Sequence, residues 1–225
     1  PDTLWDNGTT VSIDLANSLE HIWSDTKSSH RNKLNRCTKK FNLKATITRF
    51  SEGIDIFCQL YEETMARVAA KNIYYSFNKD YFVAMNAAME DNLYLCIVES
   101  ESQVASVGLY TECCGIVQSA FRGIKNTYVK QSPSILEIDY ARRWSKKQGY
   151  QHLHLGGGVG ASEDSVYKFK AGFSKERHQF LTLRLISDRD RYNYLLKARA
   201  KQLNIEPSQL QKSDFFPNYR ATLPI

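Results

Sequence analysis

The chain of 225 residues has no run of apolar residues long enough to span a bilayer. Its first ten residues, PDTLWDNGTT, contain neither the basic nor the apolar part of a secretory signal peptide. Hydrophobic residues make up 42% and charged residues 24%, and the sequence has no internal repeat. We therefore expect a soluble, cytoplasmic, globular protein. Because the sequence starts abruptly at Pro1, we also expect it to be a piece of a longer protein.

Cysteine is present in an odd number and without the spacing of a metal site. The sequence has no CxxC pair and no cysteine–histidine ligand pattern. We expect reduced, buried thiols at all five positions: Cys37, Cys58, Cys96, Cys113 and Cys114. The sequence also lacks a G-x-S-x-G elbow and a cysteine with a paired histidine, which argues against a covalent nucleophile.

His152 and His154 have the i, i+2 spacing that can place two imidazoles on one face of a strand. No third ligand is evident beside them. A polar strand face is the simpler interpretation, and we predict no metal.

Acidic residues are missing between Lys27 and Lys44, where the chain carries seven basic residues. Lys and Arg together number 30 against 24 Asp and Glu, which gives a net charge of +6. A basic helix face attracts polyanions, although a solvated surface explains it equally well. The candidate contacts with an RNA backbone are Arg31, Lys33, Arg36 and Lys40.

Hydrophobic periodicity predicts helices and strands in mixed order. Helical spacing predicts helices over 18–41 (with a potential break near Ser28 and Ser29), 52–72, 79–90, 132–149 and 188–203. Strand signals predict strands over 44–50, 93–99, 103–113, 115–123, 151–155 and 179–186. The three successive strands from 93 to 123 predict an antiparallel meander, and the strand at 151–155, which follows a helix, should pair parallel to an earlier strand. This is an α/β (mixed α+β) fold with a mixed sheet covered by helices on both faces.

Three residues carry recognisable helix-end signals. Ser18 is expected to cap the first helix. Ser132 is expected to cap the helix that starts with Pro133, and Gly149 is expected to end it.

The segment HLHLGGGVGASEDSVYKFKAGFS joins a short apolar strand to a helix through a glycine-rich turn. Its glycines are Gly156, Gly157, Gly158 and Gly160, and Ser162 or Asp164 can cap the following helix. A strand end, a glycine loop and a helix N-terminus point backbone N–H groups at one spot, which suits a phosphate or an oxyanion. A plain strand-to-helix turn is the alternative.

The chain resembles the GNAT superfamily and, within it, the Fem-type peptidyltransferases. The resemblance lies in the element order, in this segment with the preceding SPSILEIDYARRWSKKQGYQ, and in the closing SDFFPNYR. The resemblance runs from about Val11 to Arg220. It implies a GNAT-like fold and transfer of an aminoacyl group from aminoacyl-tRNA to an amine on a peptidoglycan precursor. It further implies that the chain is the second of two such domains, with a core at about 11–203 and a tail at 204–225.

Three residues are candidates for roles at the site. Lys170, in the FK pair, would by the resemblance face the tRNA terminus, where a positive donor could stabilise the oxyanion that forms when an amine attacks an ester. A solvated lysine on a short helix is its alternative. Phe169 could stack on a terminal base, although a core phenylalanine is the simpler interpretation. Arg67 matches a basic position implicated in binding precursor phosphates, and an exposed helix arginine is its alternative.

The chain departs from the acetyl-CoA enzymes of the superfamily, which hold pyrophosphate with a Q/R-x-x-G-x-G/A loop. The corresponding position reads RGIKNTYVKQSPS. We therefore expect no cofactor. Two other functions stay open from the sequence: an N-acyltransferase that takes its acyl group from acetyl-CoA or another acyl-CoA, and a non-catalytic RNA- or polyanion-binding module.

Overall fold

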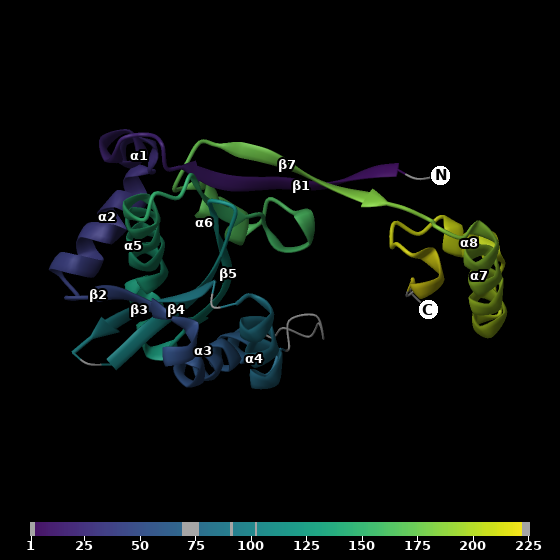
Figure 1. Cartoon of the computed structure of the whole chain (residues 1–225), viewed down its shortest axis with the longest axis horizontal. Coiled ribbons are helices and arrows are strands. Elements are labelled where there is room, and N and C mark those ends of the chain that lie inside the picture. The colour runs from purple at the N-terminus through teal and green to yellow at the C-terminus, as the bar shows by residue number, and fades with distance from the viewer. Residues whose placement is uncertain (1–2, 69–76, 91, 102, 222–225) are drawn as a thin grey trace. The chain divides into compact units, whose positions relative to one another are not determined.

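The computed structural model describes residues 3–68, 77–90, 92–101 and 103–221 (Figure 1). The strands are β1 Thr3–Asp14, β2 Lys44–Arg49, β3 Leu93–Ser100, β4 Gln103–Cys113, β5 Ile116–Ile124, β6 His152–Gly156 and β7 Arg177–Arg184. The helices are α1 Leu19–Asp25, α2 Ser28–Lys39, α3 Ile54–Arg67, α4 Lys79–Ala88, α5 Pro133–Lys147, α6 Ser165–Ala171, α7 Arg189–Leu203 and α8 Pro207–Gln211. In this described part of the chain, no helix has the length and apolarity needed to cross a membrane.

The strands form one mixed sheet in the order β2-β3-β4-β5-β6-β1-β7. Strands β2 to β5 pair antiparallel with their neighbours, which confirms the predicted meander. Strand β6 pairs parallel to β5, as the intervening helix α5 requires. The predicted mixed sheet is therefore confirmed.

Helices cover both faces of the meander because its side chains alternate (Figure 1). Leu95 and Leu109 join a cluster with residues of α3 and α4. Cys96 and Val117 join the cluster that includes residues of α2 and α5. Each of these four side chains is fully buried, so the sheet is a two-sided core.

Strand β1 was not predicted, because Asp6, Asn7 and Gly8 interrupt its apolar pattern and are typical of turns. Its second half pairs antiparallel with β6, from Val11 opposite Gly156 to Asp14 opposite His152. Neighbouring strands, rather than local sequence, fix this segment in the sheet.

The helix-end signals are confirmed except at one residue. The Ser18 hydroxyl accepts a hydrogen bond from the His21 N–H at 3.1 Å, and Gly149 follows α5 with a φ of 85°. Ser132 stands at the start of α5 with a left-handed φ of 57° and makes no side-chain cap. The predicted helix over 18–41 is two helices, separated at Thr26 and Lys27. The predicted helix over 52–72 is observed as α3, and its residues 69–72 lie outside the described residues.

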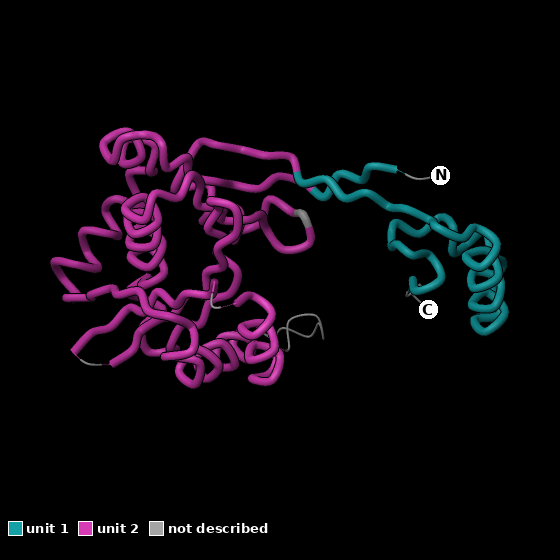
Figure 2. The backbone as a smooth tube through the Cα atoms, viewed as in Figure 1, with its two compact units in different colours: residues 1–7, 180–225 teal, residues 8–179 magenta. Residues whose placement is uncertain are grey.

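The chain divides into two compact units (Figure 2). Residues 8–179 form one unit, and residues 1–7 with 180–225 form the other. In the second unit, the buried residues Leu196 and Ala200 of α7 contact Leu210 and Ala221 in a cluster of their own. The division into a core at 11–203 and a tail at 204–225 stays a prediction.

All five cysteines are free thiols. Cys37 and Cys96 are buried, as expected. Cys113, the last residue of β4, and Cys114, in the turn that follows, are exposed, so the expectation of burial is wrong there. Within the described residues, no group of three or more His, Cys, Asp or Glu side chains is placed to hold a metal ion.

Candidate functional site

Strands β5 and β6 run side by side for only a short distance. They pair over Ile116–Gln118 and His152–His154. Beyond that point β5 continues along β4 as far as Ile124, whereas β6 continues along β1 as far as Gly156. Ligands of mixed sheets favour the carboxyl ends of strands where neighbours change. The candidate site is therefore the region where β5 and β6 separate.

Lys170, on α6, reaches back to the end of β6. Its Nζ donates a hydrogen bond to the Gly157 carbonyl oxygen at 2.7 Å, and the side chain is partly buried. Burial, followed by the positive charge of Arg122, lowers the pKa of Lys170 to about 8, against a smaller opposing effect of Asp164. The structure thus holds an ammonium group with reduced solvation at the separating strands.

The glycine turn is shaped by contacts with this chain's own backbone. Gly156 has a φ of 77°, which an L side chain rarely adopts, and Gly160 has a φ of 59°. A Cβ on Gly157 would lie 2.8 Å from the Thr9 carbonyl oxygen, and one on Gly158 would lie 2.0 Å from the Ser162 carbonyl oxygen. These glycines allow the turn to close on itself and place the Gly157 carbonyl under Lys170.

The N-terminus of α6 is occupied by a carboxylate from the chain itself. Asp164 accepts hydrogen bonds from the N–H groups of Tyr167 at 2.8 Å and Val159 at 3.3 Å, while Ser162 makes no such cap. The Tyr167 N–H, with smaller help from Val159, lowers the pKa of Asp164. The anion cradle expected at this helix start is therefore filled, and Lys170 is the cation that remains beside the turn.

A buried ionic network lies next to Lys170. Glu137, which is fully buried on α5, accepts hydrogen bonds from Arg122 Nε at 2.8 Å and Nη2 at 3.1 Å. The Tyr110 hydroxyl donates to the same carboxylate at 3.0 Å. Burial opposes the charge on Arg122, but Glu137 and, to a smaller extent, Tyr110 together outweigh it and hold the Arg122 pKa above its usual range. This network ties α5 to β4 and β5.

Gly108 on β4 makes room for that network. A Cβ there would lie 1.8 Å from Glu137 Oε1, so any other residue would displace the carboxylate. The position shows that the sheet is shaped around the Glu137 carboxylate.

Phe169 lies against the core. Its ring packs edge-on against Phe173 at 5.5 Å and lies 5.6 Å from the ring of His30. The guanidinium carbon of Arg122 lies 5.8 Å from the centre of the same ring. The ring is partly buried and already in contact with these groups, which favours the core interpretation given from the sequence.

Arg67 lies in the last turn of α3 and is held by the end of β5. Its guanidinium donates to the Ile124 carbonyl oxygen at 3.0 Å, to Thr64 Oγ1 at 3.2 Å and to the side chain of Asn126. Because α3 packs on the face of the sheet opposite to α5, the structure does not bring Arg67 to the Glu137 network.

The four basic residues of α2 and its end behave differently from one another. Arg31 donates to the carbonyl oxygens of Trp23, Ser24 and Thr26, so it holds the end of α1. The exposed cations are Lys33, Arg36 and Lys40. The structure gives Arg31 an anchoring contact that the sequence did not predict.

His154 lies near a second imidazole, that of His178. His178 Nε2 lies 2.6 Å from Ser12 Oγ, and Ser12 pairs with His154 in the sheet. Burial, followed by the nearby charges of His178 and Lys170, lowers the pKa of His154. His152 is partly exposed on the same strand face.

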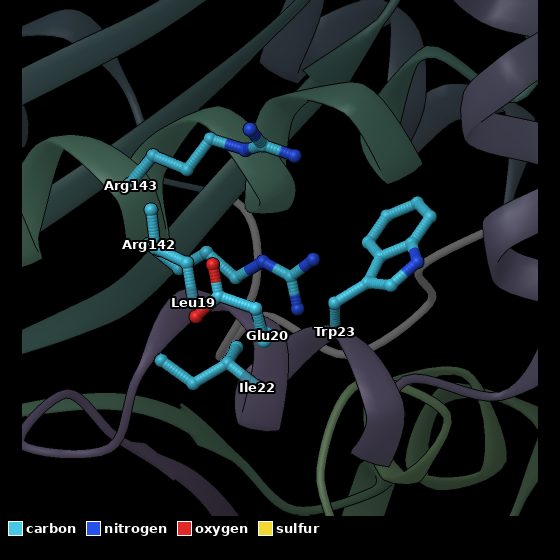
Figure 3. A pocket seen from close by; sticks show the side chains of 6 residues that line it. All are labelled: Leu19, Glu20, Ile22, Trp23, Arg142 and Arg143. Carbon is cyan, nitrogen blue, oxygen red and sulfur yellow. The ribbon is translucent and has the colours of Figure 1, made fainter.

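A cavity of about 330 Å³ lies between α1 and α5 (Figure 3). Arg142 and Arg143 extend into it from α5, and Trp23 lines it from α1. Both guanidinium groups already bond to Asp139, Arg143 at 2.9 Å and Arg142 through its Nε at 3.0 Å. These two pairs lie within α5, and Arg142 Nη1 joins this helix to the end of α1 by donating to Thr26 Oγ1 at 2.7 Å.

Arg122, Glu137 and Tyr110 are the residues near Lys170 that the sequence did not identify as site residues. A signal was present for Glu137, because an acid stands among apolar residues of the helix in SPSILEIDY. No local pattern marks Arg122 or Tyr110, whose partner lies more than ten residues away along the chain.

No family model matches the chain, and no curated protein matches its sequence. Solved structures do match. FemX has a TM-score of 0.65 and 12% identity, over 83% of this chain and 63% of FemX. The C-terminal domain of a protein named as a lysylphosphatidylglycerol synthetase from Agrobacterium fabrum has a TM-score of 0.59 and 12% identity, over 88% and 66%. L-PGS from Bacillus licheniformis has a TM-score of 0.54 and 15% identity, over 88% and 66%.

This chain therefore spans less than two thirds of each of these proteins. At such identities the likeness shows the fold alone, and this fold has the mixed sheet, antiparallel meander and flanking helices predicted from the sequence.

Proposed function

We propose that this chain is the acyl-transfer domain of a Fem-like aminoacyltransferase. It moves an aminoacyl group from aminoacyl-tRNA to an amine acceptor, such as that of a peptidoglycan precursor. The observation that carries the proposal is the Lys170 ammonium, which is held at the separating strands with a pKa of about 8. The fold of FemX and of a lysylphosphatidylglycerol synthetase, whose name indicates an aminoacyl product, supports it.

The proposed reaction is direct transfer without a covalent enzyme intermediate. The acceptor nitrogen attacks the ester carbonyl carbon and a new C–N bond forms. The C–O bond to the ribose then breaks, and the proton lost by the amine ends on the ribose oxygen. The chain's contribution is to hold the two reactants together and to stabilise the negative charge on the carbonyl oxygen.

Lys170 is the proposed donor to that oxyanion. Within the part of the chain that the structure describes, its Nζ makes one hydrogen bond, to Gly157, and an ammonium group has three protons to donate. The remaining protons are available to the carbonyl oxygen of the ester. Because the group is partly buried, its attraction for a developing negative charge is stronger than in water.

The first turn of α5 favours an acyl donor other than acyl-CoA. Pro133 has no N–H, and the side chains from Pro133 to Glu137 are all buried. Cys37 Sγ contacts the carbonyl oxygens of Gln131 and Ser132 just before the helix. A pyrophosphate would need open backbone N–H groups at this turn.

Lys33, Arg36 and Lys40 are the proposed contacts with the tRNA backbone. They are exposed, and no ion pair with another described residue neutralises them. Replacing all three by Ala should reduce the slope of log Kd for tRNA against log salt by about 2 to 3, because each lost phosphate contact removes roughly 0.7 to 0.9. An unchanged slope would remove these residues from the interface.

The decisive experiment compares Lys170→Ala with Lys168→Ala in the natural full-length protein. Lys168 is an exposed lysine of the same helix, so the two variants lose the same charge at different places. With charged tRNA as donor, Lys170→Ala should lower the transfer rate by about 100-fold to 1,000-fold, as expected for loss of one oxyanion donor. Lys168→Ala should stay within about twofold of the unchanged protein.

Two outcomes would contradict the proposal. Transfer from acyl-CoA but not from charged tRNA would select the N-acyltransferase function. Unchanged transfer by a folded Lys170→Ala variant, checked by circular dichroism, would remove the role given to Lys170.

A further inference from the structure

The unit formed by residues 1–7 and 180–225 contains a cavity of its own. Its volume is about 490 Å³, within the range of small-ligand sites. The wall is built from the start of β1, the end of β7, the first turn of α7 and the segment 211–218. This last segment includes most of SDFFPNYR, which the site around Lys170 does not use.

Flat groups form one side of this cavity. The guanidinium carbon of Arg184 lies 3.8 Å from the centre of the Trp5 ring and 5.7 Å from that of Phe216. The rings of Phe216 and Tyr192 are nearly parallel, with an interplanar angle of 20°. The Tyr192 hydroxyl accepts the Asn218 N–H at 3.0 Å, which fixes α7 to the segment 211–218. The wall is therefore made of aromatic rings and a guanidinium group that are held in place by contacts with one another.

Positive charge dominates the cavity. Arg184, Arg189 and Lys212 line it, and Asp214 is the acid among the lining residues. None of the three cations makes an ion pair with another residue in the described ranges. Arg189 and Lys212 are exposed, so both side chains are free to move onto an anion.

We propose that this cavity binds a nucleotide. The base stacks on the Trp5, Arg184 and Phe216 planes, and the phosphate is bound by Arg189 and Lys212. A simple anion would leave the aromatic wall unused, and an apolar ligand would leave three cations unpaired. The site shares no residue with the Lys170 site, so this inference goes beyond the proposed transfer reaction.

A nucleotide for this cavity has two sources, a free mononucleotide or a residue of single-stranded RNA. Binding to the full chain is measured by isothermal titration calorimetry with 5′-AMP, adenosine, inorganic phosphate and a single-stranded oligoribonucleotide. The variant Arg189→Ala/Lys212→Ala removes the phosphate contacts. The matched control is Lys197→Ala/Lys201→Ala, which removes two exposed cations of α7 that do not line the cavity.

The expected result is that 5′-AMP binds more tightly than adenosine or phosphate. Arg189→Ala/Lys212→Ala should weaken its binding about tenfold or more, and the Lys197→Ala/Lys201→Ala control should change it less than twofold. Trp5→Ala should weaken 5′-AMP and adenosine alike, by about tenfold, through lost stacking. If the oligoribonucleotide binds more tightly than 5′-AMP, and in a salt-sensitive way, the site is supported and RNA is its source. If 5′-AMP binds as tightly as the oligoribonucleotide, the site is supported and its ligand is a free nucleotide.

The proposal is overturned if 5′-AMP and the oligoribonucleotide both fail to bind at millimolar concentration, or if the cavity variant and its control lose affinity equally. These outcomes concern binding alone. They therefore do not depend on whether Lys170→Ala affects transfer.

Discussion

Two cations near the separating strands, Arg122 and Lys170, differ in the groups that accept their hydrogen bonds. Arg122 is held by both oxygens of the Glu137 carboxylate, at 2.8 and 3.1 Å. Lys170 has the neutral carbonyl oxygen of Gly157 at 2.7 Å. Burial disfavours both charges, yet the pKa of Arg122 is raised while the pKa of Lys170 is lowered to about 8. The carboxylate makes the difference.

The comparison separates a structural charge from one that is available to a substrate. The Arg122–Glu137 pair is complete, and it holds α5 against β5. Among the described residues Lys170 has no anionic partner at hydrogen-bond distance, so an oxyanion in front of it would supply the missing negative charge.

The largest effect is expected from Glu137→Ala. It leaves the Arg122 charge and the Tyr110 hydroxyl buried without their acceptor, so the free energy of unfolding should fall by about 3 to 5 kcal/mol in urea titrations. The double variant Arg122→Met/Glu137→Met removes both charges and should cost only about 1 to 3 kcal/mol, mainly for the Tyr110 hydroxyl. If Glu137→Ala costs under about 1 kcal/mol, the network is not structural and the comparison fails.

An intermediate effect is expected in the pH dependence of transfer. Lys170 must be protonated to stabilise an oxyanion, and its pKa of about 8 means that this form is present below pH 8 and lost above it. Lys170→Arg keeps its charge at all these pH values. The rate of the unchanged protein relative to Lys170→Arg should therefore fall about tenfold between pH 7 and pH 9, as the protonated fraction does.

This ratio cancels the titration of the acceptor amine and the hydrolysis of the ester, which affect both proteins alike. A ratio that stays constant from pH 7 to pH 9 would show that the charge of Lys170 is not used in the transfer step.

The smallest effect is expected on stability. The folded-state pKa of Lys170, about 8, lies below its ordinary value of 10.5, so between these values the unfolded chain binds the proton and the folded chain does not. Stability contributed by this residue should therefore rise with pH across that window. The free energy of unfolding of the unchanged protein, minus that of Lys170→Met, should increase by about 1 kcal/mol from pH 7.5 to 10.5, since partial exposure screens the effect. A decrease would mean that the folded state favours the charged lysine.

Local patterns were sufficient to predict most elements of the fold. The alternation in 93–123 predicts the meander, and the helix between β5 and β6 predicts the parallel pair. Strand β1 could not be predicted, because Asp6, Asn7 and Gly8 resemble a turn until β6 is beside them. The boundary at residue 180 was also out of reach, since it depends on which surface α7 packs against.

For the site, too, local features could be predicted from the sequence and long-range partners could not. The glycine turn and Lys170 stand out in the sequence because they are close together in it. Arg122 and Glu137 do not stand out, because each matters as the partner of the other and the two are far apart along the chain. The sequence offered two caps for α6, Ser162 and Asp164. The backbone geometry shows that Asp164 is the cap.

The sequence by itself determined the order of helices and strands, the turn that joins β6 to α6, and the presence of a lysine beside that turn, because these depend on neighbours within a few residues. Tertiary structure alone decided which cation receives a carboxylate and how far the Lys170 pKa falls. The physical reason is that the energy of a charge depends on the groups around it in space, and here those groups come from β5, α5 and the glycine turn.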